Sequence, residues 1–411
     1  MKNVRPNNLL IPILFTVLLS LLILPLISYA VQGKTPVYSQ QRAPKIIHIP
    51  QYICNQTYSD ITPALEQKLQ LAQNLSNATL SASPLKFTPR YYLFSMSNPG
   101  RTLHNFYLYD VGFDELWMTL DDRAHFITTA PLGNAFLAGT ISETSNATEF
   151  YWSYVDTLFN PAGNYIYSCT LSSQGCTNQR TIAVTSASEE IMGLSVSTSQ
   201  NRLYLALEDA SHINRPGTLY SCSLSALAND ACSLGLSHFV FHDNYTAFAN
   251  AFPDSGFIYS PNSPLPPVFF DMQSQAISML PMGVLMTPYN AAQISSSLFF
   301  TYRFYAATNP RIDFVSVNTF GAATLLGNDI TGIHPALAAI TNNAIYFVYT
   351  KANPYRQIIK PLGGSETEIY VNTTSVFAPL PFTLQKDGAV LGAYPFSSAP
   401  DYHIYMSNCR F

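Results

Sequence analysis

The chain has 411 residues, of which 47% are hydrophobic and only 11% are charged. Charged residues make up about 25% of a typical domain, so this composition indicates a large buried core and excludes a disordered chain. The formal net charge of −4, without a basic stripe, argues against nucleic acid as a partner. The 26 tyrosines, 26 phenylalanines and 28 prolines favour strands and turns over helices.

The first thirty residues have the pattern of an export signal. Lys2 and Arg5 precede an uncharged apolar stretch, residues 9–27, and Ser28-Tyr29-Ala30 then offers small residues where a signal peptidase cleaves. We therefore predict a signal peptide over residues 1–30 and a periplasmic or extracellular protein. An uncleaved anchor is the alternative, because about 20 apolar residues can span a bilayer. A membrane is an expected partner only in that second case.

Residues 31–86 are predicted to hold a closing strand and a helical segment, ahead of a repeat region over residues 87–411. The only β-like segment before the repeats is 45–58. The last repeat ends after its third strand, so we expect this segment to supply the missing fourth strand, pairing from about Gln51 onward. Residues 62–80 predict a helix, because Thr62 can cap it and Pro63 suits the first helical position.

Two columns of similar residues run through the repeat region. Members of the first are spaced 44, 68, 54, 41, 47 and 45 residues apart, and members of the second 58, 53, 50, 44, 45 and 46. A period of about 40–50 residues that holds several short strands is typical of a β-propeller blade. The first column is Tyr92, Phe136, Tyr204, Ile258, Phe299, Tyr346 and Leu391; the second is Tyr109, Tyr167, Tyr220, Phe270, Phe314, Ile359 and Tyr405.

The chain resembles the β-propeller superfamily at the level of this repeat, across residues 45–411. Its Tyr-Ser-Cys segments at 167–169 and 220–222, each followed by a second cysteine, resemble blades of poorly characterised exported bacterial proteins. The predicted fold class is therefore all-β, a seven-bladed β-propeller closed by an N-terminal strand, with one short helix near the N-terminus. The resemblance assigns no functional role to any residue.

The six cysteines predict three disulfides, as suits an exported protein. Cys169 and Cys222 occupy equivalent repeat positions, and each has a second cysteine close behind it. Symmetry therefore predicts one bridge inside each hairpin, while the two remaining cysteines would fix the closing strand to the last repeat. A zinc site is the alternative, but no C-x-x-C pair occurs. The predicted bridges are Cys169–Cys176, Cys222–Cys232 and Cys54–Cys409.

The longest predicted loops fall in the second and third repeats. Residues 141–163 are expected to form an inserted loop that carries Tyr151 and Trp152, and the next repeat has a polar loop with Asp209, His212 and Arg215. Insertions on one face of a repeat protein commonly form its binding surface. We therefore predict an exported, monomeric, non-catalytic protein that binds a protein or glycan partner through these loops, without a cofactor.

A hydrolase or lyase acting at the mouth of the propeller channel is the alternative function. His125, His242 and His334 lie in alternate repeats and could converge on a metal ion, and paired carboxylates could perform acid–base chemistry. Polar residues such as His104 and Arg101 also fall in the predicted loops. Turns favour polar residues for conformational reasons alone, however, and the motifs G-x-S-x-G and H-E-x-x-H are absent from the sequence.

Overall fold

The computed structural model divides the chain into two units, Met1–Gln41 and Arg42–Phe411, and every residue described below belongs to the second. The described residues are 52–72, 78–82, 84–131, 136–155, 165–185, 190–208, 217–225, 227, 231–234, 239–241, 245–252, 254, 256–261, 268–279, 292–295, 298–305, 311–318, 323–331, 333–341, 344–351, 355–372, 379–395 and 402–411. Within these ranges, no helix is long and apolar enough to cross a membrane.

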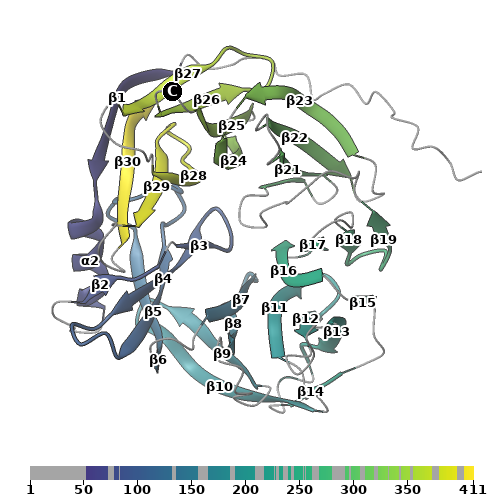
Figure 1. Cartoon of the computed structure of the whole chain (residues 1–411). Coiled ribbons are helices and arrows are strands. Elements are labelled where there is room, and N and C mark those ends of the chain that lie inside the picture. The colour runs from purple at the N-terminus through teal and green to yellow at the C-terminus, as the bar shows by residue number, and fades with distance from the viewer. Residues whose placement is uncertain are drawn as a thin grey trace, which may run out of the picture. The chain divides into compact units, whose positions relative to one another are not determined.

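The described strands form seven sheets that follow one another in chain order (Figure 1). The first sheet holds β2 (Thr79–Leu80), β3 (Leu85–Lys86), β4 (Tyr91–Ser97), β5 (Leu103–Asp110) and β6 (Arg123–Pro131). The second holds β7 (Phe136–Glu143), β8 (Thr148–Val155), β9 (Tyr165–Ser172), β10 (Gly175–Thr185) and β14 (Ala231–Ser233). The third holds β11 (Glu190–Ser197), β12 (Arg202–Glu208), β13 (Gly217–Ser223) and β15 (Phe239–Phe241).

The remaining four sheets have four strands each. The fourth holds β16 (Tyr245–Phe252), β17 (Gly256–Pro261), β18 (Val268–Asp271) and β19 (Ile277–Met279), and the fifth β20 (Ala292–Ser295), β21 (Leu298–Tyr305), β22 (Arg311–Asn318) and β23 (Ala323–Thr331). The sixth holds β24 (Ile333–Thr341), β25 (Ala344–Lys351), β26 (Tyr355–Pro361) and β27 (Thr367–Asn372). The seventh joins β28 (Leu380–Leu384), β29 (Val390–Pro395) and β30 (Tyr402–Arg410) to β1 (Ile53–Asp60).

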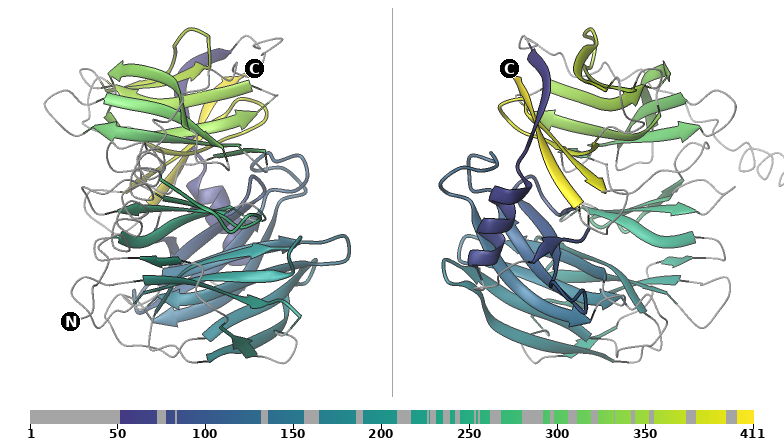
Figure 2. Two further views of the ribbon diagram at one scale, coloured as in Figure 1. Left: turned by 90° about the vertical axis from the view of Figure 1, so that its right-hand side faces the viewer. Right: turned by 60° about the vertical axis from the view of Figure 1, so that its left-hand side comes forward.

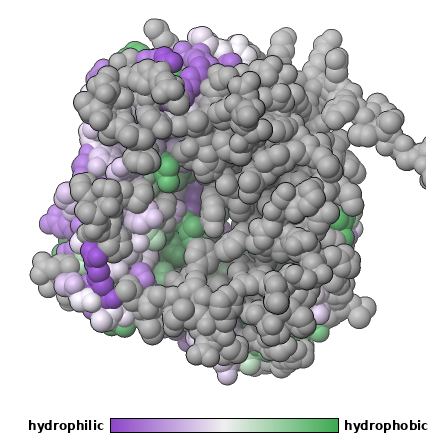
Figure 3. All heavy atoms as spheres, viewed as in Figure 1, coloured by the Kyte–Doolittle hydropathy of each residue, from purple (hydrophilic) through white to green (hydrophobic). Residues whose placement is uncertain are grey.

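The core lies between neighbouring sheets. Every residue of β4 is buried, because other sheets cover both of its faces. Alternate side chains of a strand point to opposite faces, so Tyr92 and Phe94 join one apolar cluster while Tyr91 and Leu93 join another. In the described part of the face drawn in Figure 3, apolar residues gather toward the middle and hydrophilic residues lie mostly at the margins.

The second column of the sequence is confirmed, since each of its seven members lies in the third strand of its sheet. The first column lies in the second strand of every sheet except the second. Three of its tyrosines, Tyr92, Tyr204 and Tyr346, are no more than 2% exposed, as expected for core residues. The side chain of Phe299 lies outside the described residues.

In the second repeat the predicted register is wrong. Residues 141–143 belong to β7 and residues 148–155 form β8, so the expected inserted loop is largely a regular hairpin. Tyr151 pairs with Ser168 as Tyr204 pairs with Ser221, which makes Tyr151 the true member of the first column. It lies 53 residues before Tyr204, the same spacing that separates Cys169 from Cys222.

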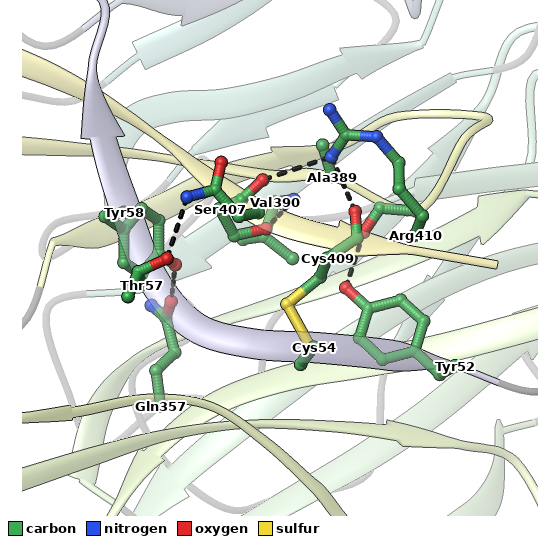
Figure 4. The surroundings of a disulfide bond; sticks show 12 residues. Tyr52, Cys54, Thr57, Tyr58, Gln357, Ala389, Val390, Ser407, Cys409 and Arg410 are labelled. Atoms are coloured by element: carbon green, nitrogen blue, oxygen red, sulfur yellow. Dashed lines mark hydrogen bonds between the residues drawn. A yellow bond between two sulfur atoms is a disulfide. The ribbon is translucent and has the colours of Figure 1, made fainter.

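The N-terminal segment pairs with the last repeat, as predicted. β1 pairs antiparallel with β30, from Ile53 opposite Arg410 to Asp60 opposite Tyr405. The right-hand view of Figure 2 shows β1 running beside β30 and leading into the helix α2. Cys54 and Cys409 are bonded within this pair (Figure 4).

The closing strand also contacts the sixth sheet. The hydroxyl group of Tyr58 donates a hydrogen bond to the side chain of Gln357, which is itself fully buried (Figure 4). The Tyr58 ring packs edge-to-face against Tyr370, with 5.2 Å between the ring centroids. β1 therefore links the seventh sheet to its neighbour as well as completing it.

The helix is shorter than predicted. α2 covers Thr62–Leu71, and residues 79–80 form β2 instead. Thr62 is not the N-terminal cap; its hydroxyl group accepts a hydrogen bond from the backbone of Ile404 at 2.8 Å, and the Asp60 carboxylate accepts from the Thr62 backbone at 2.9 Å. Glu66 accepts from the Leu80 backbone at 2.9 Å and so ties the helix to β2.

All three predicted disulfides are present, but one has a different setting from the one expected. Cys169–Cys176 lies inside the β9–β10 hairpin, as predicted. Cys222–Cys232 connects β13 of the third sheet to β14. Because β14 pairs in parallel with β10, this bridge links the second and third sheets rather than closing a hairpin.

Candidate functional site

Two of the predicted binding residues are core residues. Tyr151 and Trp152 lie in β8 and are 3% and 2% exposed. The Trp152 ring stacks between Phe150 and Tyr167, at centroid distances of 5.3 and 5.8 Å. The expectation of a ligand-binding aromatic loop at these two residues is therefore wrong. Both residues lie in a strand, and each ring packs between neighbouring sheets.

Asp209, His212 and Arg215 lie outside the described residues, as does His242, and the side chain of His334 does too. His125 lies in β6 and is 4% exposed, so it is not a loop residue. Among the described residues, no group of three histidine, cysteine or acidic side chains could hold a metal ion.

The connection between β5 and β6, residues 111–122, has the most distinctive geometry among the described loops, and we call it the first-sheet loop. Three of its residues, Gly112, Glu115 and Met118, have positive φ angles of 75°, 55° and 66°. Non-glycine residues rarely adopt this conformation unless surrounding contacts impose it. A Cβ added at Gly112 would lie 2.0 Å from the Asp121 carboxylate, so the Asp121 side chain would have to move.

A buried tryptophan holds the middle of this loop. Trp117 is 4% exposed and packs against Tyr92, Tyr109 and Phe382, at centroid distances of 4.8, 5.1 and 5.7 Å. Phe382 belongs to β28, so the ring bridges the first and seventh sheets. Burying an aromatic side chain of this size makes a large contribution to stability, and it fixes the loop at its centre.

A buried carboxylate holds the end of the loop. Asp122 is completely buried and accepts hydrogen bonds from the Met118 backbone at 2.6 Å and the Tyr109 hydroxyl group at 2.5 Å. Lys68 of α2 lies 3.4 Å from the same carboxylate and also donates to the Thr119 carbonyl oxygen at 2.9 Å. These contacts impose the positive φ angle of Met118 and attach the loop to the helix.

An ion pair holds the start of the loop. Arg90 donates two hydrogen bonds to Asp110, at 2.5 and 2.6 Å, and Asp110 also accepts from the Gly112 backbone at 2.9 Å. The Asp110 carboxylate raises the pKa of the Arg90 guanidinium. The charged plane of Arg90 in turn lies 4.2 Å from the centroid of the Phe113 ring.

The loop lies where three sheets meet. Glu115 pairs with Lys386 of the seventh sheet at 3.3 Å, and Arg90 reaches Glu143 of the second sheet at 3.6 Å. Lys86 of β3 donates to Thr383 of β28 at 3.3 Å. Desolvation lowers the pKa of the Lys86 amine to about 8, and the nearby Glu115 opposes this shift.

Although the loop is fixed at three points, it displays large apolar groups to solvent. Phe113 is 83% exposed and Leu120 is fully exposed. Each is followed by an exposed acidic residue, Asp114 or Asp121. Apolar side chains held in fixed positions without cover are the ordinary elements of a binding surface.

The predicted loop lengths did not single out residues 111–122 as a binding surface, because the longest loop was assigned from the wrong register in the second repeat. Two signals were present in residues 111–122. The segment VGFDELWMTLDD holds one of only two tryptophans in the chain, together with four acidic residues. A polar turn rarely combines these, but a loop with its own buried anchor does.

No protein-family model matches the chain, and no curated protein sequence matches it.

Several solved structures resemble it at low identity. They include dihydro-heme d1 dehydrogenase NirN in complex with DHE, at 12% identity over 82% of this chain and 68% of that chain, with a TM-score of 0.47. TolB from Acinetobacter baumannii is 10% identical over 79% of this chain and 78% of that chain, with a TM-score of 0.34. The Pyrococcus horikoshii acylaminoacyl peptidase is 11% identical over 82% of this chain but only 52% of that chain, with a TM-score of 0.46. Because each TM-score lies below 0.5, these likenesses assign no function.

Proposed function

We propose that residues 87–411 form a seven-bladed β-propeller closed by β1, and that this exported protein binds a protein partner at the first-sheet loop. The seven sheets in chain order support the blade count, and the pairing of β1 with β30 supports the closure. Three disulfides that use all six cysteines support export, because such bonds persist in oxidising compartments.

The observation that carries the binding proposal is the fixed display of Phe113 and Leu120. A partner that buries them loses little conformational entropy on the side of the propeller, because Trp117, Asp122 and Arg90 already hold the loop. A buried aromatic anchor is also the most common energetic centre of a protein interface. The geometry of the loop thus favours binding by a rigid surface.

The charges beside these two residues indicate the chemistry of the partner. Asp114 and Asp121 are exposed, and a hydrogen bond from Thr119 lowers the pKa of Asp121, so its carboxylate stays ionised. A complementary partner segment therefore combines apolar side chains with lysine or arginine. We favour a protein over a glycan because Leu120 offers a sugar neither a ring to stack on nor a hydrogen-bonding group.

The test uses a phage-displayed peptide library selected on the purified protein, followed by affinity measurements on the enriched peptides. We expect enriched peptides to share basic and apolar residues, and the double change Phe113→Ser with Leu120→Ser to weaken their binding at least tenfold. Ile277→Ser is the matched control, since Ile277 is 43% exposed on the fourth sheet. The affinity of the Ile277→Ser variant for the enriched peptides should stay within twofold of that of the parent.

Two results would overturn the proposal. One is a set of enriched peptides whose affinity is the same for the double variant and the parent. The other is loop-dependent binding on a glycan array without any peptide binding, which would replace the protein partner by a sugar. Thermal unfolding of each variant shows whether the fold is retained.

A further inference from the structure

Three side chains that could perform acyl transfer meet at the opposite end of the first sheet's strands from the first-sheet loop. The Oγ atoms of Ser81 and Ser95 lie 3.1 and 2.9 Å from Nδ1 of His104, and 2.9 Å from each other. Ser81 follows β2, while Ser95 and His104 belong to β4 and β5. The sheet therefore brings together residues that are 9 to 23 positions apart in the sequence.

The backbone of the sheet fixes this triangle. The Ser81 amide donates to the Ser95 carbonyl oxygen at 2.9 Å, which continues the pairing of β2 with β4. His104 pairs with Ser97 in the neighbouring strand, close to the turn that joins β4 to β5. The His104 ring also lies 6.1 Å from that of Phe106, measured between centroids. Ser95 and His104 thus start from paired strands, and Ser81 directly follows one.

The protonation state of His104 suits a general base. Burial lowers the pKa of its imidazole, so the ring is neutral at neutral pH. Two hydroxyl groups face Nδ1, and its single lone pair can accept a hydrogen bond from one of them at a time. We therefore assign the proton of the neutral ring to Nε2 and leave Nδ1 free to accept a proton.

We propose that Ser81 is a nucleophile for acyl transfer and that His104 is its base, with an activated ester as the class of substrate. Ser81 is the better placed of the two serines, because it is half-buried whereas Ser95 is 9% exposed. A nucleophile and a base within hydrogen-bond reach, supported by a third group, form the arrangement that covalent catalysis requires. Ser95 is then a positioning residue that orients both partners.

The reaction balances without any further reagent. Ser81 Oγ forms a bond to the acyl carbon while its proton passes to Nδ1 of His104. The ester bond breaks, and the leaving alkoxide takes that proton from His104 and departs as the alcohol. Water then attacks the acyl-serine with His104 again as base, which releases the acid and restores the serine.

A fluorophosphonate probe tests the nucleophile directly on the purified protein. Its phosphorus forms a bond to Oγ and fluoride leaves, so peptide mass spectrometry identifies the labelled serine. We expect labelling at Ser81, its loss in Ser81→Ala, and a rate at least tenfold lower in His104→Gln. Ser95→Ala should lower the labelling rate more than threefold without abolishing it, because Ser95 orients Ser81 and His104 while the direct contact between those two residues remains.

Ser274→Ala is the matched control, since Ser274 donates to a carboxylate, that of Asp271, and not to an imidazole. It should label like the parent. The labelling rate of the parent should also rise with pH around a midpoint below 6.5, which serves as a second readout if His104→Gln does not fold. No labelling, labelling at another residue, or an unchanged rate in a folded His104→Gln would overturn the proposal. The outcome does not depend on the first-sheet loop.

Discussion

The guanidinium group of Arg90 lies 4.2 Å from the centroid of the Phe113 ring, and two hydrogen bonds tie it to Asp110. One side chain therefore both neutralises a nearly buried carboxylate and orients an aromatic ring that is 83% exposed. An arginine can do both because its planar group donates two parallel hydrogen bonds while its face stays available for stacking. This pair connects the stability of the first sheet to the proposed binding surface.

Replacing Arg90 by Ala should lower the free energy of unfolding by about 2–3 kcal/mol. The change leaves Asp110 without its bidentate partner, and the side chain of Asp110 is only 7% exposed. Chemical denaturation measures the effect. Arg356→Ala is the matched control, because Arg356 and Glu368 are 35% and 34% exposed and such pairs contribute less than about 1 kcal/mol. Equal losses in the two variants would contradict the prediction.

Replacing Trp152 by Ala should destabilise the fold by about 3–5 kcal/mol, because the change opens a cavity between the first and second sheets. A lower melting temperature measures this loss. The control is Tyr165→Ala, which truncates an aromatic residue in the neighbouring strand that is 41% exposed. That variant should lose less than about 1 kcal/mol. A Trp152 variant with an unchanged melting temperature would show that this ring is not part of the core.

These residues show what a single sequence can and cannot predict. The pairing of Cys54 with Cys409 can be predicted from the sequence. Repeat symmetry pairs the other four cysteines, and the missing strand of the last repeat brings these two together. The role of Trp152 does not, since an alternating aromatic strand and an aromatic loop have similar compositions. The contacts of Arg90 with Phe113, and of Ser81 with His104, depend on which strands become neighbours and in what register. A one-residue change of register would turn each of these side chains to the opposite face.

Removing the Cys54–Cys409 bridge should cost more than removing the bridge inside the β9–β10 hairpin. The first joins residues 355 apart and the second residues 7 apart. In the loop-entropy account, the long closure contributes about 6 kcal/mol and the short one about 2.5 kcal/mol. Denaturation of the two double-alanine variants, Cys54→Ala with Cys409→Ala and Cys169→Ala with Cys176→Ala, compares them. A larger loss for the hairpin pair would count against closure by β1.

The stability of the protein should rise with pH in the range where His125 titrates. His125 is 4% exposed, and burial lowers its pKa below the usual 6.5; the positive charges of Arg123 and Arg90 act in the same direction, and Asp110 opposes them. Protonation therefore favours the unfolded chain. Stability is lowest below the folded-state pKa, increases as the pH rises from that value to 6.5, and is level above it.

Denaturation midpoints between pH 5 and pH 8 test this prediction. In His125→Gln the midpoint should rise less with pH, since the unfolded chain then has one fewer group that takes up a proton in this range. Part of the rise should remain, because burial also lowers the pKa of His104. The double change His125→Gln with His104→Gln should therefore reduce the rise further than the single change does. If the single variant keeps the full slope of the parent, His125 is not the group that titrates, and other residues link the stability to pH.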